Sequence, residues 1–360
     1  MRDNEQIYEA VYLGEFPPPY GGVTVKNKLL YDSIFNDYNC KKLDIYTYTK
    51  NLLRLPELYL ELIRLKRKHG YLYLGSGSIK RTELLIKLIN FVGGEMLLNH
   101  VNIFVMGGVF NETFKNKPNV IKLLRKVGLI YYELRSLVND AKTMGLNNSM
   151  YFPNCRDGNM KKPNHSLTKP SIRLVFFSTV NREKGVPELL EMAKILNERC
   201  IAFTLDIYGE LQADYKDEFE MNIKRTHHCN YYGVFDGTGG DVYSLLNSYD
   251  LLLLPTHWQG EGCIGVLVES KIAGIPAIAS DWRYNSEIII DGKEGVIVSG
   301  NQAVGFADAV ERISKDEEMY DALCKEASDS IERYDFNIYL PEVKRAVENQ
   351  LCSVQRISTI

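Results

Sequence analysis

The sequence predicts an α/β protein built of two doubly wound domains, and three observations lead to this fold class. Stretches with strand-like and helix-like hydrophobic patterns alternate in two separate series along the chain. A polar, proline-rich segment between Pro153 and Pro170 separates the two series. The length of 360 residues exceeds most single compact cores and suits two domains.

The first domain is expected to span residues 1–155. Because strands and helices alternate there, the strands should form a parallel sheet with both faces covered by helices. A helix should begin near Val23, after a loop that contains three consecutive prolines. The remaining elements are strands at 7–14, 43–47, 71–74 and 102–106, and helices at 52–68, 81–91 and 120–126.

A linker at 156–170 should lead to a second α/β domain at 171–333, followed by a helix within 334–360 that packs back against the first domain. The second domain should also be doubly wound, since its elements alternate in the same way. They are strands at 173–178, 204–208, 230–233, 251–255, 277–280 and 295–298, and helices at 186–198, 242–247 and 266–273.

Composition excludes several classes of protein. No apolar run approaches the roughly 20 residues of a spanning helix, and the polar N-terminus does not look like a signal peptide, so we expect a soluble cytoplasmic protein. The seven cysteines are scattered without a Cys-x-x-Cys pair, which argues against a disulfide framework and a zinc site. No Asp-x-Asp triplet occurs, so the usual metal-carboxylate grip on a diphosphate is missing and we expect no metal cofactor.

Charge is distributed unevenly along the chain. Residues 1–155 hold 21 Lys and Arg against 14 Asp and Glu, a net charge of +7, whereas the remaining residues sum to −10. Leu52–His69 is an amphipathic stretch that ends in a cationic cluster, which suits either an anionic membrane surface or a buried helix face with a solvated basic end. We expect peripheral contact with the inner face of a membrane rather than with nucleic acid, since no nucleic-acid recognition motif accompanies the charge.

The segment Gly260–Glu269 contains the most informative side chains. It follows the apolar strand at 251–255, so Glu261 should lie in a loop and Glu269 near the second turn of a helix. A loop carboxylate can accept hydrogen bonds from sugar hydroxyls, a helix carboxylate can hold a ribose diol, and Gly262 and Gly265 allow backbone N–H groups to approach oxygen closely. By itself, this spacing is more typical of a turn residue and a solvated helix residue.

The same segment, continued to Asp281, resembles the donor-binding signature of retaining family 4 glycosyltransferases (glycosyl transferases group 1). The resemblance implies a GT-B fold, in which two Rossmann-like domains face each other across a cleft. It also implies that Glu261 takes part in catalysis. The donor nucleotide-sugar would be bound by Gly262, Cys263, Ile264, Gly265, Val266 and Glu269.

The resemblance extends upstream to Val175–Val186. In the family, an Arg and a Lys of this segment hold the donor diphosphate, and Lys184 matches the Lys. The usual Arg position is Thr179 here, so the nearby Arg182 is predicted to supply the second cation. Fixed cations are needed because the leaving diphosphate gains charge in the transition state.

Looser matches place further loops around the donor. Gly21 and Gly22 resemble the paired glycines of the family's first-strand loop, although Pro-Pro-Pro-Tyr-Gly-Gly could also form a tight turn without a ligand. Gly209 and Val234 resemble positions that face the nucleobase, and Glu287 lies in a segment similar to the family's Gly-Gly-x-x-Glu-like segment.

One feature of the family is missing. Its members commonly carry a His at the end of a first-domain strand, but this chain has Met106-Gly107 there, and His100 lies at the opposite end of that strand. His100 is interpreted as a surface or structural residue.

The sequence therefore predicts a retaining, metal-independent hexosyltransferase of bacterial surface polysaccharide biosynthesis. The donor would be a nucleotide-sugar, most simply a UDP-sugar, and the acceptor a saccharide or a lipid-diphosphate-linked oligosaccharide. Retention would follow from attack on the face that the diphosphate leaves, with a phosphate oxygen taking the acceptor proton. A nucleotide-sugar epimerase of the same fold and a catalytically weak sugar-nucleotide binding protein are the alternatives.

Overall fold

The computed structural model describes residues 10–18, 21–156, 166–236 and 241–358. The chain divides into two compact units. Unit 1 comprises residues 1–157 and 335–360, and unit 2 comprises residues 158–334. The chain therefore crosses from one unit to the other twice, once beside the predicted linker and once after Tyr334.

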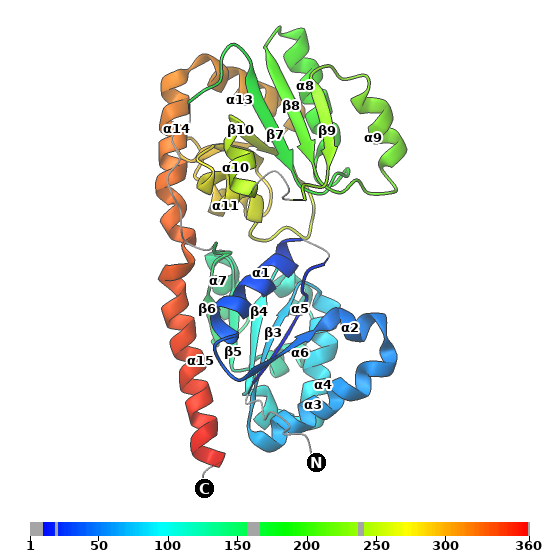
Figure 1. Ribbon diagram of the computed structural model, residues 1–360, viewed down its shortest axis with the longest axis vertical. Coiled ribbons are helices and arrows are strands. Elements are labelled where there is room, and N and C mark those ends of the chain that lie inside the picture. The colour runs from blue at the N-terminus through cyan, green and yellow to red at the C-terminus, as the bar shows by residue number, and fades with distance from the viewer. Residues whose placement is uncertain (1–9, 19–20, 157–165, 237–240, 359–360) are drawn as a thin grey trace. The chain divides into compact units, whose positions relative to one another are not determined.

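Unit 1 contains a sheet of six parallel strands in the order β2-β1-β3-β4-β5-β6 (Figure 1). The strands are short, and most are apolar, as expected when helices cover both faces of a sheet, whereas the edge strand β2 carries two lysines and an aspartate. The strands are β1 (Ala10–Gly14), β2 (Cys40–Asp44), β3 (Tyr71–Ser76), β4 (Val101–Val105), β5 (Leu129–Tyr132) and β6 (Ser149–Tyr151).

The helices of unit 1 include one from the far end of the chain. Phe336, Val343, Val347 and Leu351 of α15 are buried in the same cluster as Tyr12 and Tyr73 of the sheet, so α15 completes this core. The helical segments are α1 (Gly22–Leu30), η1 (Tyr31–Phe35), α2 (Ile45–Lys50), η2 (Leu52–Arg54), α3 (Leu55–Lys68), α4 (Ile79–Leu98), α5 (Phe110–Lys115), α6 (Pro118–Leu124), α7 (Arg135–Thr143) and α15 (Phe336–Ser358).

The predicted strand at 43–47 is wrong in its position. The strand ends at Asp44, whose side chain accepts a hydrogen bond of 3.0 Å from the Tyr46 backbone N–H and thereby caps α2. Alternating aromatic and β-branched residues after Asp44 favour a strand by propensity, but the cap starts a helix there. Residues 7–9 of the first predicted strand lie outside the described residues, and β5 and β6 were not predicted.

Unit 2 contains a second parallel sheet of six strands, in the order β12-β11-β10-β7-β8-β9. The two sheets confirm the predicted fold class. The strands are β7 (Ile172–Phe177), β8 (Phe203–Tyr208), β9 (Cys229–Gly233), β10 (Leu251–Leu254), β11 (Ala277–Ser280) and β12 (Gly295–Val298).

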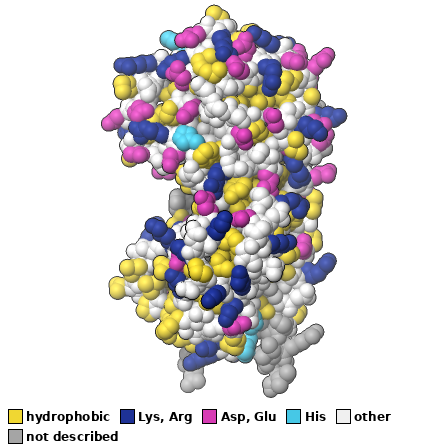
Figure 2. Space-filling model, turned by 180° about the vertical axis from the view of Figure 1, so that it is seen from behind, with side chains coloured by type: hydrophobic (Ala, Val, Ile, Leu, Met, Phe, Trp, Pro, Cys, Tyr) yellow, Lys and Arg dark blue, Asp and Glu magenta, His cyan; other side chains and the backbone are white. Residues whose placement is uncertain are grey.

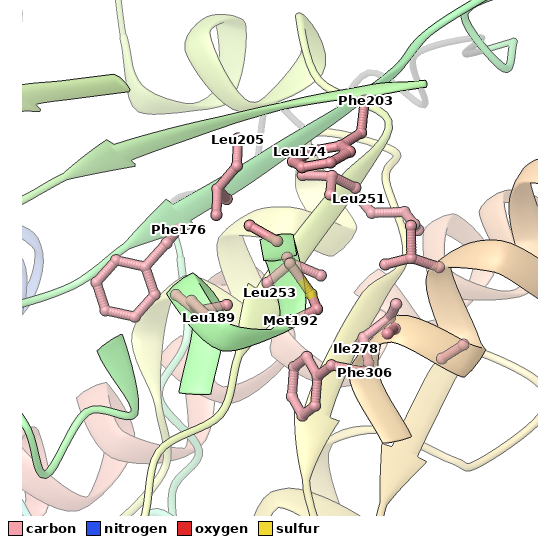
Figure 3. Packing of buried hydrophobic residues seen from close by; sticks show 14 of the residues in the cluster. Leu174, Phe176, Leu189, Met192, Phe203, Leu205, Leu251, Leu253, Ile278 and Phe306 are labelled. Carbon is pink, nitrogen blue, oxygen red and sulfur yellow. The ribbon is translucent and has the colours of Figure 1, made fainter. Parts of the chain in front are cut away.

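The core of unit 2 follows from the two-residue period of its strands. Alternate strand residues such as Leu174 and Phe176 of β7 point to one face, where they pack against Met192 of α8 and Phe306 of α13 (Figure 3). The helical segments are α8 (Val186–Glu198), α9 (Lys216–Ile223), α10 (Val242–Asn247), α11 (Gly265–Ile272), α12 (Asn285–Ile288), α13 (Gln302–Lys315), α14 (Glu317–Asp329) and η3 (Ser330–Tyr334).

Each sheet has one point where the strand order reverses. In unit 2 the chain leaves β7 toward β8 on one side and returns to β10 on the other, and in unit 1 the reversal lies between β1 and β3. Loops that follow the two strands at such a point separate and leave room for a ligand. The site of each unit is therefore sought at the carboxyl ends of these strand pairs.

Among the described residues, no helix combines the length and the apolar character needed to cross a membrane.

Candidate functional site

Lys184 and Glu261 meet at the strand-order reversal of unit 2. Lys184 lies in the loop after β7 and Glu261 in the loop after β10, and their side chains form an ion pair. The Glu261 residue is 4% exposed and the Lys184 side chain 14% exposed, so the pair is largely shielded from water. Residues 77 positions apart in the chain thus form one charged centre.

The two loops are held together by backbone contacts. The His257 N–H donates a 2.8 Å hydrogen bond to the carbonyl of Glu183. Gly185 has a φ of +79°, and a Cβ atom there would lie 2.2 Å from the carbonyl oxygen of Pro255. Asn181 accepts a 2.7 Å hydrogen bond from the Lys184 N–H, which fixes the backbone that carries the ammonium group. The ion pair is therefore positioned by the loops rather than by chance contact of long side chains.

Two residues of the β10 loop complete the centre, and neither was predicted. The buried Thr256 hydroxyl donates a 2.7 Å hydrogen bond to Glu261 Oε1. The Trp258 ring lies beside the ammonium group, with Lys184 Nζ 4.4 Å from the ring centroid, a cation–π contact. A Thr in the first residues after an apolar strand at a reversal point is the signal that could have identified Thr256.

Residues at the end of β11 and in the loop after it donate hydrogen bonds to the loop after β10. The Ser280 hydroxyl donates to the carbonyl of Thr256 at 2.6 Å, and the Trp282 indole N–H donates to the carbonyl of Trp258 at 2.8 Å. Asn285, which is buried, donates to the carbonyl of Ser280 at 3.0 Å. Three consecutive strands of the sheet order thus contribute to one site.

The predicted donor-binding segment leads into α11. Ile264 is the N-cap residue of this helix and Gly265 its first residue. Cys263 and Val266 are buried, whereas Gly262, Ile264 and Gly265 are partly exposed. The N–H groups of the first helical turn carry partial positive charge and lie a few residues after Glu261 in the chain. Glu269, predicted to hold a ribose diol, is partly exposed in the second turn.

A buried charge cluster anchors the opposite side of α11. Lys271 is fully buried and donates to Glu294 at 2.7 Å and to the Ser330 hydroxyl at 2.9 Å. Arg333 of η3 donates to both oxygens of the same carboxylate at 2.6 Å. Burial lowers the pKa of Lys271 to about 8 despite the neighbouring carboxylate. Burial alone would raise the pKa of Glu294, but Lys271 and Arg333 hold it below its ordinary value.

Arg182 does not join this centre. Its guanidinium forms an ion pair with Glu218 of α9 and lies over the Tyr215 ring, 4.8 Å from the centroid. The side chain is half-exposed. The structure therefore brings two of the three predicted catalytic side chains together and places the third against α9.

Gly209 and Val234 lie at the ends of β8 and β9. Gly209 has a φ of +141°, and a Cβ atom there would lie 1.8 Å from the carbonyl oxygen of Ser178, so the glycine is needed for backbone packing. Val234 is exposed. Next to it, the exposed Tyr232 ring stacks on Tyr208 with centroids 5.0 Å apart and an interplanar angle of 14°. This aromatic surface was not predicted.

In unit 1, Gly21 and Gly22 start α1 after the loop that follows β1. Gly21 is the N-cap residue, and among the described residues that do not adjoin it in the chain, none has an atom within 4 Å of a Cβ placed on Gly21 or Gly22. The Thr24 hydroxyl accepts a 3.0 Å hydrogen bond from the Gly21 N–H. Within the described part of the chain, the space beside both glycines is therefore open.

A second polar cluster lies at the reversal point of unit 1. Glu15, which follows β1, is buried and accepts hydrogen bonds from Arg81 at 2.8 Å and from the Ser76 hydroxyl at 3.3 Å. The Tyr46 hydroxyl donates to its other oxygen at 3.3 Å. No sequence pattern singled out these residues, which only the sheet order brings together.

His100, interpreted from the sequence as a surface or structural residue, and Met106 lie at opposite ends of β4. His100 precedes β4, and the centroid of its ring lies 4.5 Å from that of the Tyr71 ring. Burial is the main cause that lowers the pKa of His100, and the nearby His69 lowers it further. Met106 follows β4 at the carboxyl end and is buried. Glu287, the other loosely matched residue, lies partly exposed in the short helix α12.

The arrangement in unit 2 suits a ligand with a phosphate and a sugar joined to each other. A cation for the phosphate and a carboxylate for a sugar hydroxyl lie side by side, next to a helix N-terminus. Within the described part of the chain, no group of three or more His, Cys, Asp and Glu side chains is placed to hold a metal ion.

Comparison with known proteins identifies the domain that carries this site. Residues 159–330 match the family model of glycosyl transferases group 1. An uncharacterized 41.2 kDa protein from the cps region of Klebsiella pneumoniae is 25% identical over 75% of this chain and 78% of its own length. The capsular polysaccharide biosynthesis glycosyltransferase CapM of Staphylococcus aureus is 22% identical over 73% of each chain.

The solved structures add the fold class. Anabaena HepE in complex with UDP-glucose superposes with a TM-score of 0.73 at 14% identity, over 94% of this chain and 99% of that protein. This likeness extends across both units, and together with the domain match it shows the GT-B fold.

Proposed function

We propose, from the group 1 glycosyltransferase domain at residues 159–330, that this chain is a retaining hexosyltransferase that uses a UDP-sugar donor. The Lys184–Glu261 centre carries the proposal, because it joins a phosphate-binding cation to a sugar-binding carboxylate at one point. HepE, one of the structural neighbours, binds UDP-glucose, which favours uridine as the donor base.

The proposed transfer forms one C–O bond and breaks another, and it moves one proton. The acceptor hydroxyl oxygen bonds to the anomeric carbon while the bond from that carbon to the diphosphate oxygen breaks. The bonding electrons leave with the diphosphate, and one of its oxygens takes the acceptor proton on the same face. Lys184 stabilises the charge that develops on the diphosphate, which a fixed ammonium group can do without reorganisation.

The other residues position the donor. Glu261, held by Thr256, accepts hydrogen bonds from hydroxyls of the transferred sugar, and Glu269 holds the ribose. Backbone N–H groups at Gly262–Val266 bind phosphate oxygens. Arg182 acts as a second cation only when its guanidinium leaves Glu218. No step of this scheme requires a metal ion.

For the acceptor, we propose a saccharide or a lipid-diphosphate-linked oligosaccharide of bacterial surface polysaccharide biosynthesis. CapM, a relative over most of its length, is a capsular polysaccharide biosynthesis glycosyltransferase. The open glycines Gly21 and Gly22 and the Glu15–Arg81 cluster at the reversal point of unit 1 are the groups available to meet it.

Release of UDP from UDP-sugars in the presence of lipid-linked acceptors tests the proposal. Lys184→Ala and Glu261→Gln should each lower turnover by roughly 10²-fold or more, the typical effect of losing one transition-state contact. Lys194→Ala is the matched control, because Lys194 forms an exposed ion pair with Glu191 on α8. Circular dichroism must show that each variant is folded, since one half of a shielded pair is removed.

Three outcomes would contradict the proposal. Wild-type turnover in a folded Lys184→Ala variant would remove the electrostatic role of this residue. Conversion of the donor to an epimer without an acceptor would identify an epimerase. Calorimetric binding of UDP-sugar without release of UDP by any acceptor would identify a binding protein.

A further inference from the structure

The indole ring of Trp258 is fixed in the loop after β10 by its neighbours. The Trp258 carbonyl accepts hydrogen bonds from the Trp282 indole N–H at 2.8 Å and from the Glu261 N–H at 3.3 Å. Its own N–H donates to the Thr256 hydroxyl at 3.3 Å. The ring lies against the loop itself, since a Cβ atom placed on Gly260 would be 2.5 Å from Cζ2 of Trp258. Both the backbone and the ring of Trp258 are therefore held in place.

Thr256, Glu261, Lys184 and Trp258 contact one another in a closed cycle. The Thr256 hydroxyl, which accepts from the Trp258 N–H, donates to Glu261 Oε1 at 2.7 Å. The same carboxylate pairs with the Lys184 ammonium group, and Lys184 Nζ lies 4.4 Å from the centroid of the Trp258 ring. An anionic ligand competes with the carboxylate for the ammonium group but not with the ring, which is neutral and attracts the cation through its π face.

The exact position of the Lys184 ammonium group matters because the second predicted cation lies elsewhere. Arg182 pairs with Glu218 and lies over the Tyr215 ring. On the face that Figure 2 shows, basic and acidic side chains are mixed over unit 2, so a diphosphate meets local cations there rather than a broad positive field. A lysine carries its charge on a flexible four-carbon chain, which must be held in one position if the ammonium group is to act without reorganisation.

We propose that Trp258 is a positioning residue for the Lys184 ammonium group during transfer. This step rests on the proposed function, in which the ammonium group leaves Glu261 and contacts the donor diphosphate. The Trp258 ring then keeps the ammonium group in place after the carboxylate has ceased to hold it. The ring also covers one side of the ammonium group, and exclusion of water there strengthens its attraction to the diphosphate.

The ring should matter more in the transition state than in the complex with the intact donor. Negative charge on the diphosphate grows as its bond to the anomeric carbon breaks, so a misplaced ammonium group costs more at that stage. In the free chain, Glu261 still holds Lys184 when the ring is absent. Loss of the ring should therefore lower kcat more than it weakens donor binding.

Substitutions of Trp258 separate its π face from its apolar bulk. Trp258→Leu should lower kcat for UDP release about tenfold, while KM for the UDP-sugar changes by less than about threefold. Trp258→Phe keeps a weaker π face and should recover most of the lost kcat. Circular dichroism checks that both variants are folded. A purely structural role of the side chain would give similar losses in the two variants.

Gly260→Ala tests the same contact without removing the indole. The added Cβ atom would lie within 2.8 Å of three carbons of the Trp258 ring, so the ring must move. The value of kcat should fall about as far as in Trp258→Leu, and the double variant Trp258→Leu/Gly260→Ala should be no slower than Trp258→Leu alone. Losses that multiply in the double variant would contradict the proposal, because the glycine would then act independently of the ring.

Fluorinated tryptophan tests the electrostatic contribution of the ring directly. The chain has two tryptophans, so Trp282→Phe leaves Trp258 as the only one. In this variant, kcat and the affinity for UDP should both fall with each added ring fluorine, since fluorine weakens the negative face of the ring and changes its shape little. Trp258→Phe, which retains Trp282, is the matched control, and the same fluorines should have no effect there.

Calorimetry with UDP keeps this test apart from the test of the proposed function. A chain whose UDP affinity falls with fluorination, but which releases no UDP from any donor, would support the ring contact and contradict the transferase. Transfer with kcat and UDP affinity unchanged across the fluorinated series would overturn the inference alone, as would wild-type kcat in a folded Trp258→Leu variant. A chain that binds no UDP would contradict both.

Discussion

Lys184 and Glu261 neutralise each other. Glu261 therefore competes with any anionic ligand for the Lys184 ammonium group. An anion that approaches the Lys184 ammonium must displace the Glu261 carboxylate, which stays behind in a largely buried position held by Thr256. A sugar hydroxyl that hydrogen-bonds to Glu261 offsets part of this cost. A donor with both groups should therefore be favoured over a free diphosphate.

This competition predicts opposite effects on binding and turnover for Glu261→Gln. The affinity for free UDP should rise, by about threefold to tenfold, because Lys184 loses its competing carboxylate. Titration calorimetry measures the dissociation constant, and Glu191→Gln, which releases the exposed Lys194, is the control. Weaker UDP binding by Glu261→Gln would show that the pair does not compete with the ligand.

Arg182 should matter less than Lys184, although both were predicted as diphosphate cations. Its guanidinium is half-exposed, paired with Glu218 and stacked on Tyr215, and such surface pairs contribute little to stability. Arg182→Ala should lower turnover by no more than about tenfold, against roughly 10²-fold for Lys184→Ala. Equal losses in steady-state assays of the two variants would place Arg182 on the diphosphate during transfer.

At the scale of elements, the helix α11 is held at its two ends in different ways. Its N-terminal turn follows the Glu261 loop, while Lys271 near its C-terminal end is buried with Glu294 and Arg333. Breaking a buried ion pair by removing one partner is strongly destabilising, about 3–5 kcal/mol. The cluster thus holds α11 in place relative to Glu294 and Arg333.

Lys271→Met should change how stability depends on pH. The folded chain loses the Lys271 proton near pH 8 and the unfolded chain near 10.5, so between these values the unfolded state binds more protons. The wild-type free energy of unfolding should therefore rise relative to that of Lys271→Met between pH 7 and 9.5, by about 2 kcal/mol. Urea unfolding of both proteins at the two pH values measures this difference, and a constant difference would contradict it.

The sequence predicted elements well where a long hydrophobic period was present and poorly where tertiary contacts decide. The six strands of unit 2 were predicted nearly to the residue, because their apolar runs are bounded by polar loops. The strand β6 has only three residues and offers no period to detect. Asp44 shifted the end of β2 through a side-chain cap that propensity cannot reveal.

In the candidate site of unit 2, too, local sequence predicted some residues, and tertiary contacts decided the rest. Lys184 and Glu261 were found through local motifs, but their pairing required the sheet order that brings β7 beside β10. Trp258 could be identified as a residue of the site only from the structure, where its ring contacts the Lys184 ammonium group. Arg182 was assigned from its position next to Lys184, and the structure turns its side chain toward α9 instead.

At the scale of the molecule, both units reverse their strand order once, and the polar clusters lie at those points. The Glu15–Arg81 cluster lies beside β1 and β3, and the Lys184–Glu261 pair lies beside β7 and β10. Topology rather than local sequence therefore assigns one candidate site to each unit.

The packing of α15 in the core of unit 1 leads to a prediction about the stability of that unit. Val347 is 1% exposed within the core of unit 1, so Val347→Ala should destabilise that unit by about 1–3 kcal/mol through lost packing and a small cavity. Hydrogen exchange should accelerate in β1–β5 and stay unchanged in β7–β12. Exchange that accelerates equally in both units would mean that they unfold as one.

The position of α15 also constrains the order of folding during synthesis. The ribosome completes the sheet of unit 1 long before it makes Phe336, Val343 and Leu351, so one side of that sheet must wait for nearly the whole of unit 2 to be translated. Unit 2 is continuous and can close first. In this protein the part of the chain that emerges earliest is therefore the part that acquires its final packing last.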